Sequence, residues 1–237
     1  MTPALFAKLQ ALRAERRPVA VVTNLANGHQ CLALSTGGTD GSELVLTDEI
    51  RDQVGAMLTA GSSGQIESET GTLFVRSYTP PWSLAIVGAV HITQFLAPMA
   101  RLAGFDVTVI DPRRAFATDQ RFPDVAMITG WPDEIMARTP PGPQTAVVTL
   151  THDPKIDDPA LIAALRSDAF YIGALGSSRT HAQRVARLVE HGLSETQVAR
   201  VAAPVGLDLG GRMPAEIAIS VLAEVVATRH GKPRTSR

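Results

Sequence analysis

The stretch Tyr171–His181 reads YIGALGSSRTH and decides the fold, because it passes from a strand through a turn into a helix. An apolar run ends in Tyr171 and Ile172, the glycines Gly173 and Gly176 permit a tight turn, and an amphipathic stretch follows. A turn of this kind presents backbone N–H groups at the start of a helix, where phosphates and other anions bind. The segment therefore predicts a parallel α/β sheet that carries an anion-binding loop.

The chain from residue 84 onward alternates apolar runs with helical patterns, as parallel sheets require. Each run is too apolar for a sheet with one solvated face, so each strand should be buried on both faces. The expected strands are 84–87, 107–110, 125–128, 146–150 and 170–172. The expected helices are 92–103, 160–166, 180–190 and one that starts at Pro214, ends before Gly231 and buries Ile217, Val221, Leu222 and Val225. We predict a Rossmann-like parallel sheet of about five strands flanked by helices over residues 84–231.

The first 76 residues have the pattern of a small α+β domain. Residues 77–83 contain Pro80 and Pro81, which forbid helix and favour an extended linker. The expected elements are a helix over 2–14, strands over 19–24, 43–47 and 73–76, and a helix over 48–59 capped by Asp48. Residues 232–237 are expected to form a flexible tail.

Composition excludes several classes of protein. The chain has 237 residues, 45% hydrophobic and 19% charged, with a formal net charge of −1. Near-neutral charge and 5% aromatic residues argue against nucleic-acid binding. The sequence shows neither a signal peptide nor a transmembrane run, which predicts a cytoplasmic protein. One cysteine, Cys31, excludes an internal disulfide and a cysteine-based zinc site, and no metal site is predicted.

Ligands of such sheets bind beyond the carboxyl ends of the strands, so the residues that follow each strand are candidates. Gly88 is the first glycine of a degenerate G-x-G-x-x-G pattern, in which Val90 and Thr93 replace the other two. Asp111 follows the second strand at the spacing of an acid that binds a ribose hydroxyl, although a capped turn explains it equally well. His152 and Asp153 could orient a ligand, bind a metal or move a proton. Alternatively, Asp157 or Asp158 caps a helix and His152 is merely an exposed histidine.

Two later loops are richer in polar groups than a structural turn requires. Ser177, Ser178 and Arg179 add hydrogen-bond donors to the glycine turn, and a purely structural turn would not need the arginine. Residues 203–214 place Asp208 and Arg212 among three glycines directly before a long helix. Close packing against the 173–181 loop would explain this second loop, and so would a contribution to the same pocket.

Segments 171–181 and 203–218 closely resemble the signature of the XdhC/CoxI family. Further matches are Gly88 with His91, Asp111 with Arg113 and Phe116, Phe122 with Pro123, and residues 151–153. Together these blocks span about residues 84–231.

The resemblance implies a maturation factor for molybdenum hydroxylases such as xanthine dehydrogenase or aerobic carbon monoxide dehydrogenase. Such a factor binds the molybdenum cofactor, protects it while a cysteine desulfurase supplies its terminal sulfur, and delivers it to the apo-enzyme; a homodimer is also implied. The chain would then be no enzyme and would have no catalytic residues. The cofactor-binding residues expected are Gly88, His91, Asp111, Arg113, His152, Asp153, Gly173, Gly176, Ser177, Ser178, Arg179, Asp208 and Arg212.

The sequence departs from the family pattern at two places. The family's first domain carries a glycine-glycine-cysteine-acid motif, whereas residues 34–41 here read LSTGGTDG. Cys31 lies nearby, but a lone cysteine after a strand is more often a small buried residue. Val90 stands where the family has glycine, which makes dinucleotide binding less favourable than cofactor binding.

Two other functions fit parts of the sequence. An NAD(P)-dependent oxidoreductase is favoured by the strand spacing and by Asp111, but opposed by Val90 and Thr93 and by the lack of a Tyr-Lys pair for proton transfer. A regulatory paralogue that docks on the target enzyme without cofactor would suit the divergent first domain.

Overall fold

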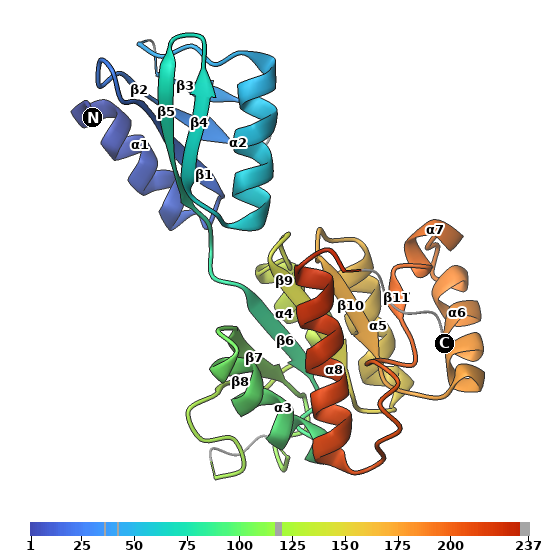
Figure 1. The fold of residues 1–237 in the computed structure, drawn as a ribbon. Helices are drawn as coiled ribbons and strands as arrows, with labels where there is room; N and C mark the ends of the chain where they lie inside the picture. The colour runs from blue at the N-terminus through green and yellow to red at the C-terminus, as the bar shows by residue number, and fades with distance from the viewer. Residues whose placement is uncertain (36, 42, 117–119, 233–237) are drawn as a thin grey trace. The chain divides into compact units, whose positions relative to one another are not determined.

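The computed structural model describes residues 1–35, 37–41, 43–116 and 120–232. The chain divides into two compact units, Met1–Pro80 and Pro81–Arg237, and each unit is described by itself (Figure 1). The division falls between two prolines, neither of which can donate a backbone N–H to a sheet. Most of the predicted tail, residues 233–237, lies outside the described residues.

The first unit is an antiparallel sheet with one helix on each face (Figure 1). Its strands are β1 (Val19–Asn24), β2 (Gln30–Leu34), β3 (Thr39–Asp40), β4 (Gly64–Ser68) and β5 (Gly71–Tyr78), in the order β3-β2-β1-β5-β4. Helix α1 (Pro3–Ala14) packs on Val19 and Val21, whereas α2 (Asp48–Ala60) packs on the alternate residues Ala20 and Val22. Side chains that alternate along β1 thus supply both cores.

Two predictions in this unit are wrong. Residues 43–47 form no strand, although Leu44 and Leu46 are buried and produce the alternation that suggested one. The cap of α2 is Thr47, whose hydroxyl accepts a hydrogen bond from the Ile50 amide, and Asp48 is already the first helical residue. Strands β2, β3 and β4 were not predicted from the sequence.

The second unit contains a parallel sheet of six strands, which confirms the Rossmann-like fold. Its strands are β6 (Ser83–Val87), β7 (Asp106–Ile110), β8 (Ala126–Ile128), β9 (Thr145–Thr149), β10 (Tyr171–Ala174) and β11 (Val201–Ala202). Their order is β11-β10-β9-β6-β7-β8, and every neighbouring pair is parallel. The sixth strand, β11, is too short to be recognised from its apolar pattern.

Helices cover both faces of this sheet (Figure 1). One core joins α3 (His91–Leu102) and α8 (Pro214–Arg229) to sheet residues such as Ile86 and Val148. The other joins α5 (Pro154–Leu165) and α6 (Ser178–Glu190) to the alternate residues Val87 and Val147, with α4 (Pro132–Arg138) beside α5. Burial on both faces explains why most of these strands are almost wholly apolar.

Several helix details differ from the predictions. Helix α5 begins at Pro154, not at the predicted residue 160, and is capped by Asp153, not by Asp157 or Asp158. Helices α4 and α7 (Glu195–Val198) were not predicted. The buried face of α8 includes Ala218, Val221 and Val225, whereas the predicted Ile217 and Leu222 are only partly buried. Among the described residues, no helix is both long enough and apolar enough to cross a membrane.

Candidate functional site

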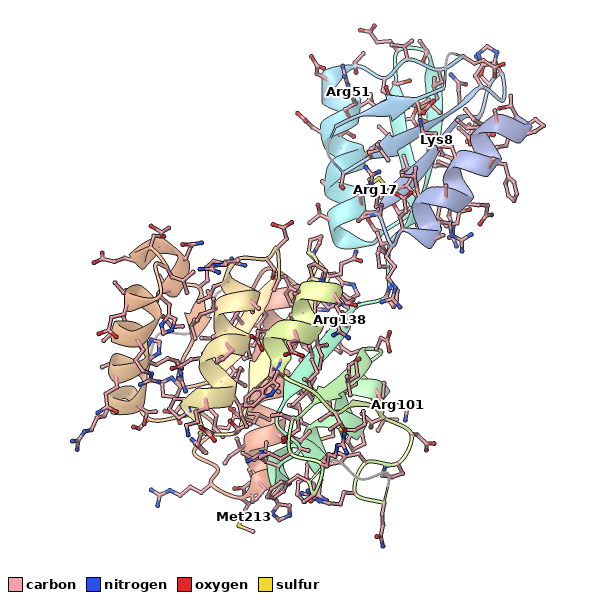
Figure 2. All side chains as sticks on the ribbon, turned by 180° about the vertical axis from the view of Figure 1, so that it is seen from behind. Lys8, Arg17, Arg51, Arg101, Arg138 and Met213 are labelled. Atoms are coloured by element: carbon pink, nitrogen blue, oxygen red, sulfur yellow. The ribbon has the colours of Figure 1, made fainter. Side chains whose placement is uncertain are left out.

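The carboxyl ends of the six parallel strands lie at one edge of the second unit. From the central strand β6 the chain proceeds through β7 and β8 on one side, and then through β9 to β11 on the other. The direction reverses between β6 and β9, and ligands of open α/β sheets bind at this switch point. Figure 2 shows Met213, the cap residue of α8, at the end of the unit where the strands finish, and Arg138 of α4 at the opposite end.

Gly88 stands directly at the switch point. Its backbone has φ of +116°, and a Cβ atom placed on it would lie 2.7 Å from Cγ2 of Thr151. The Gly88 amide donates to the Ile110 carbonyl at 2.8 Å, and the buried Thr93 hydroxyl donates to the Gly88 carbonyl at 2.5 Å. The loops after β6 and β9 therefore touch, and only glycine fits between them.

Asp111 is fully buried and accepts four hydrogen bonds from its own chain. Oδ2 accepts from the Ala89 amide at 2.7 Å and from Arg113 Nη2 at 2.8 Å, and Oδ1 accepts from the Arg113 amide and Nε, both at 2.9 Å. Burial alone would raise the pKa of Asp111, but the hydrogen bonds from Arg113 and Ala89 outweigh it and hold the pKa below its ordinary value. With about four acceptor positions on a carboxylate all used, Asp111 clamps the β6 and β7 loops together.

Arg113 connects this clamp to the neighbouring loop. Its guanidinium lies 4.6 Å from the centre of the Phe116 ring, and about a third of the side chain is exposed. The hydrogen bond to Asp111 raises the pKa of Arg113, and the charges of Asp111, Asp153 and Asp157 raise it further. Arg113 thus lies within electrostatic reach of two carboxylates after β9.

The loop after β9 is organised by its own side chains. The Thr151 hydroxyl donates to Oδ1 of Asp157 at 2.7 Å and accepts from the Asp153 amide at 3.0 Å. Asp153 Oδ1 accepts from the Lys155 amide at 3.0 Å as the cap of α5. His152 is exposed in a left-handed backbone conformation with φ of +61°. Burial raises the pKa of Asp157, whose charge the neighbouring His152 favours.

The glycine loop between β10 and α6 is open to solvent at its tip. Ser177 caps α6 by accepting a hydrogen bond from the Thr180 amide at 3.2 Å, and Ser177, Ser178 and Arg179 are all exposed. Beneath them the buried Arg184 donates through Nη2 to the Leu175 carbonyl at 2.8 Å. The loop therefore leaves the start of α6 and the Arg179 side chain accessible.

Gly173 and Gly176 shape this loop for different reasons. A Cβ atom on Gly173 would lie 2.6 Å from Cγ2 of Val205, so this glycine allows residues 203–206 to pack against β10. Gly176 has φ of +140°, and a Cβ atom there would lie 3.1 Å from the Thr180 side chain. Both positions require a residue without a side chain.

Residues 208–212 form an exposed loop before α8. Asp208 accepts a hydrogen bond from the Gly210 amide at 3.3 Å, and Arg212 projects from the loop as an exposed side chain. The amides of Arg212 and Met213 donate to Glu216 Oε2 at 2.8 and 2.9 Å, and these two bonds lower the pKa of Glu216. Asp208 and Arg212 thus belong to a loop that α8 holds by its first turn.

The structure brings only part of the predicted set into contact. Gly88 lies against Thr151, Asp111 bonds to Arg113, and Gly173 lies against Val205 in the chain that leads to Asp208. The charges of Asp153 and Asp157 act on Arg113. His91, at the start of α3, is exposed and has a ring contact with Phe95, with 5.5 Å between the ring centres.

The residues that hold these loops in place were not assigned that role from the sequence. They are Thr151, Asp157, Arg184, Glu216 and Glu224. Two of the five could have been found from the sequence, because a charged residue on the buried face of a helix stands out. They are Glu224 in α8 and Arg184 in α6. Among the described residues, no group of three or more His, Cys, Asp and Glu side chains could hold a metal ion.

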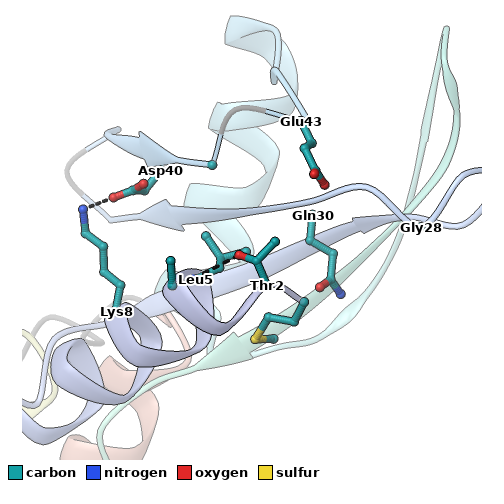
Figure 3. Close-up of a pocket in the computed structure, with 10 residues that line it drawn as sticks. Thr2, Leu5, Lys8, Gly28, Gln30, Asp40 and Glu43 are labelled. Atoms are coloured by element: carbon teal, nitrogen blue, oxygen red, sulfur yellow. Dashed lines mark hydrogen bonds and ion pairs between the residues drawn. The ribbon is translucent and has the colours of Figure 1, made fainter.

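The first unit contains a separate cavity of about 610 Å³ (Figure 3). An ion pair between Lys8 of α1 and Asp40 of β3 lies on its wall, with Gln30, Glu43 and the start of α1 around it. Asp40 and Gly41 belong to residues 34–41, where the resemblance leads one to expect a cysteine motif that this sequence lacks. None of the predicted site residues lines this cavity.

Cys31 lies in the core of the first unit. Its side chain is fully buried in β2 among residues that pack against α2. Burial raises the pKa of the Cys31 thiol to about 11. This environment agrees with the interpretation of Cys31 as a small buried residue.

The burial of Cys31 makes its thiol inert in the folded protein. At pH 7 a thiol with a pKa of about 11 is ionised in roughly one molecule in ten thousand, and the thiolate is the reactive form. We expect negligible reaction with an aromatic disulfide reagent in buffer and complete reaction of one thiol in guanidinium chloride. Rapid reaction of the native protein, followed by absorbance, would contradict the buried position.

Comparison with known proteins identifies relatives of this chain. The model of the XdhC Rossmann domain matches residues 84–225. A Bacillus subtilis (strain 168) protein named as a probable subunit of xanthine dehydrogenase is 33% identical over 162 residues, which cover 68% of this chain and 47% of the relative. The molybdenum cofactor insertion chaperone PaoD of Escherichia coli (strain K12) is 34% identical over 156 residues, 66% of this chain and 43% of its own length. This chain thus spans less than half the length of both relatives.

A solved structure supports the fold. A crystal structure described as a xanthine dehydrogenase from Bacillus halodurans matches 96% of this chain and 66% of its own, with a TM-score of 0.67 and 24% identity. The XdhC domain match covers more than half of the chain and extends from β6 into α8, so it includes all the loops of the carboxyl edge. The chain belongs to the XdhC family.

Proposed function

We propose that this chain binds the molybdenum cofactor as cargo at the carboxyl edge of its Rossmann sheet and delivers it to an apo-enzyme of the xanthine dehydrogenase or carbon monoxide dehydrogenase type. The observation that supports this proposal most is the exposed β10–α6 loop with Arg179, one strand away from the loop at the switch point. One relative is named as a molybdenum cofactor insertion chaperone, and another as a probable component of xanthine dehydrogenase.

The chemistry of the loop suits the phosphate of the cofactor. The first-turn amides of Ser178 and Arg179 have no partner within α6, and a helix N-terminus favours anions. The Arg179 guanidinium adds a charge-assisted donor. Each such hydrogen bond contributes about 1.5 to 3 kcal/mol, so a few of them give micromolar affinity for a phosphate ester.

The remaining predicted residues suit the polar pterin. His152, Asp208 and Arg212 are exposed or partly exposed and carry groups that exchange hydrogen bonds with a heterocycle. We propose that Gly88, Asp111 and Arg113 act by shaping the floor of the site, because Asp111 already bonds to its own chain. His91, Asp153, Gly173 and Gly176 complete the proposed set.

In this proposal the protein holds the cofactor without transforming it. A cysteine desulfurase would supply the sulfur ligand while the cargo is bound, the apo-enzyme would receive it, and the chain would act as a homodimer in the cytoplasm. None of these steps requires a catalytic residue in the chain.

The proposal predicts that Arg179→Ala loses the cargo. Wild type purified from cells that make the cofactor should release a fluorescent pterin after oxidation. Arg179→Ala should retain less than about a tenth of it, since one charge-assisted bond is worth about 1.5 kcal/mol or more and about 1.4 kcal/mol is tenfold in affinity. The matched control is Arg138→Ala, which removes the same charge from the opposite end of the unit (Figure 2).

Equal pterin in Arg179→Ala and wild type would move the site away from this loop. Titration with NADH and NADPH, followed by their fluorescence, tests the oxidoreductase alternative in the same preparations. Nucleotide binding without pterin would favour that alternative over the proposed function, and a wild type with neither would favour a cofactor-free regulator.

A further inference from the structure

We propose that Glu224 is a positioning residue that fixes the 208–212 loop at the carboxyl edge and thereby places Arg212 for cargo binding. This inference rests on the proposed function. It concerns a carboxylate on the inner face of α8, away from the exposed residues of the site.

Glu224 bonds to two separate parts of the fold. Its side chain is 2% exposed, and Oε2 accepts from the Tyr171 hydroxyl at 2.6 Å and from the Gly206 amide at 2.7 Å. Tyr171 begins β10, the strand that leads into the glycine loop, whereas Gly206 leads into the 208–212 loop. One buried oxygen therefore joins the segments that precede both loops.

The backbone at Gly206 packs closely against α8. Gly206 has φ of +93°, and a Cβ atom there would lie 3.0 Å from both the Ser220 carbonyl carbon and the Val221 amide nitrogen. The Ser220 hydroxyl donates to the Leu207 carbonyl, and the Leu207 amide donates to the Ser220 carbonyl at 3.2 Å. Residues 206 and 207 thus have a fixed place on the helix.

The far end of the loop is held by a second carboxylate of the same helix. Glu216 Oε2 accepts from the Arg212 and Met213 amides, as described above. Between the two anchors, most of residues 208–212 are exposed. The position of the Arg212 side chain therefore depends on Glu224 at one end and on Glu216 at the other.

A buried carboxylate at this position lowers the stability of the fold relative to an apolar side chain of similar size, because burial of a charge is unfavourable. Both the Tyr171 hydroxyl and the Gly206 amide donate to the same oxygen, and a glutamine keeps one acceptor oxygen for them but lacks the negative charge that strengthens such bonds. Glutamine therefore preserves the volume of the side chain while weakening its bonds to the loop. This makes Glu224→Gln a selective test.

The first test measures the loop without cargo. Hydrogen exchange followed by mass spectrometry should show faster exchange of the peptide covering residues 206–212 in Glu224→Gln than in wild type. The matched control is Glu190→Gln, at the exposed end of α6, which should leave this peptide unchanged. Ser220→Ala loosens the same segment and replaces Glu224→Gln if that variant does not fold.

The second test is a double-mutant cycle on cargo affinity. Glu224→Gln should weaken pterin binding by about tenfold, because a loosened loop must be ordered on binding. In an Arg212→Ala background the same substitution should have little further effect on pterin binding, although it should lower the thermal midpoint by a similar amount in both backgrounds. A purely structural role would give equal effects on binding in the two backgrounds.

The outcomes separate the two proposals. Wild type that holds no pterin would overturn the proposed function. Wild type that holds pterin, together with unchanged affinity in Glu224→Gln or additive effects in the cycle, would overturn the positioning role alone. Unchanged exchange of the 206–212 peptide would also overturn it.

Discussion

Asp111→Ala is expected to lower the free energy of unfolding by about 3 kcal/mol, since removing one partner of a buried pair strands the other. The substitution deletes all four hydrogen bonds at the junction of β6 and β7. It leaves the Ala89 amide buried without an acceptor and the Arg113 guanidinium without its partner. Both defects lie beneath the switch point, so we expect cargo retention to fall as well.

Urea denaturation followed by circular dichroism measures this loss. Asp106→Ala provides the matched control, because Asp106 is an exposed aspartate at the start of β7, the strand that Asp111 follows. It should change the free energy of unfolding by less than about 0.5 kcal/mol, as surface substitutions usually do. Equal losses in the two variants would show that the Asp111 clamp contributes nothing specific.

The effect of Asp111→Ala should also depend on pH. The folded pKa of Asp111 lies below the ordinary value of 3.8, so ionised Asp111 stabilises the folded state above that value. As pH falls through the folded pKa, the carboxylate is protonated and this stabilisation is lost. The difference between wild type and Asp111→Ala should therefore be constant near neutral pH and shrink below about pH 4.

Gly206→Ala is expected to destabilise the second unit by about 4 kcal/mol, the sum of left-handed backbone strain and steric overlap. The added methyl would lie 3.0 Å from backbone atoms of α8, which cannot move without shifting the helix. The substitution should also displace residues 208–212 and weaken pterin binding.

Gly210→Ala separates backbone strain from steric overlap. Gly210 also has a positive φ, of +74°, but a Cβ atom there would meet nothing within 4 Å. It should therefore cost only about 1 kcal/mol, the backbone term alone. Thermal unfolding of both variants, followed by circular dichroism, tests the difference, and similar midpoints would argue against the close approach of Gly206 to α8.

Hydrophobic pattern was sufficient to predict the main architecture. Strands β6, β7, β9 and β10 were predictable because they are largely buried on both faces and bounded by turn residues. The expectation of burial on both faces is wrong for β8, whose residues at the edge of the sheet are exposed or half-buried. β11 escaped detection because two residues carry no pattern, and residues 43–47 were mistaken for a strand because Leu44 and Leu46 alternate without pairing to a neighbour. Strand pairing is a tertiary property that alternation alone does not determine.

The site was predictable in position but not in contacts. The loops at the carboxyl edge follow from the order of strands and helices, so their residues could be named in advance. The orientation of Asp111 could not, because its acceptor atoms bond to amides of two different loops. The same limit applies to Glu224, whose partners are separated from it by 18 and 53 residues in the chain.

Both edge strands of the six-stranded sheet are very short, since β11 has two residues and β8 has three. An edge strand of this length offers few unpaired backbone groups to another chain, so the addition of a further strand to the sheet is disfavoured. Assembly of the second unit with a second copy or with an enzyme would accordingly have to use the side chains of helices and loops. Specificity for a partner would then be a matter of surface shape and charge, which substitutions on the helices can alter without disturbing the parallel sheet.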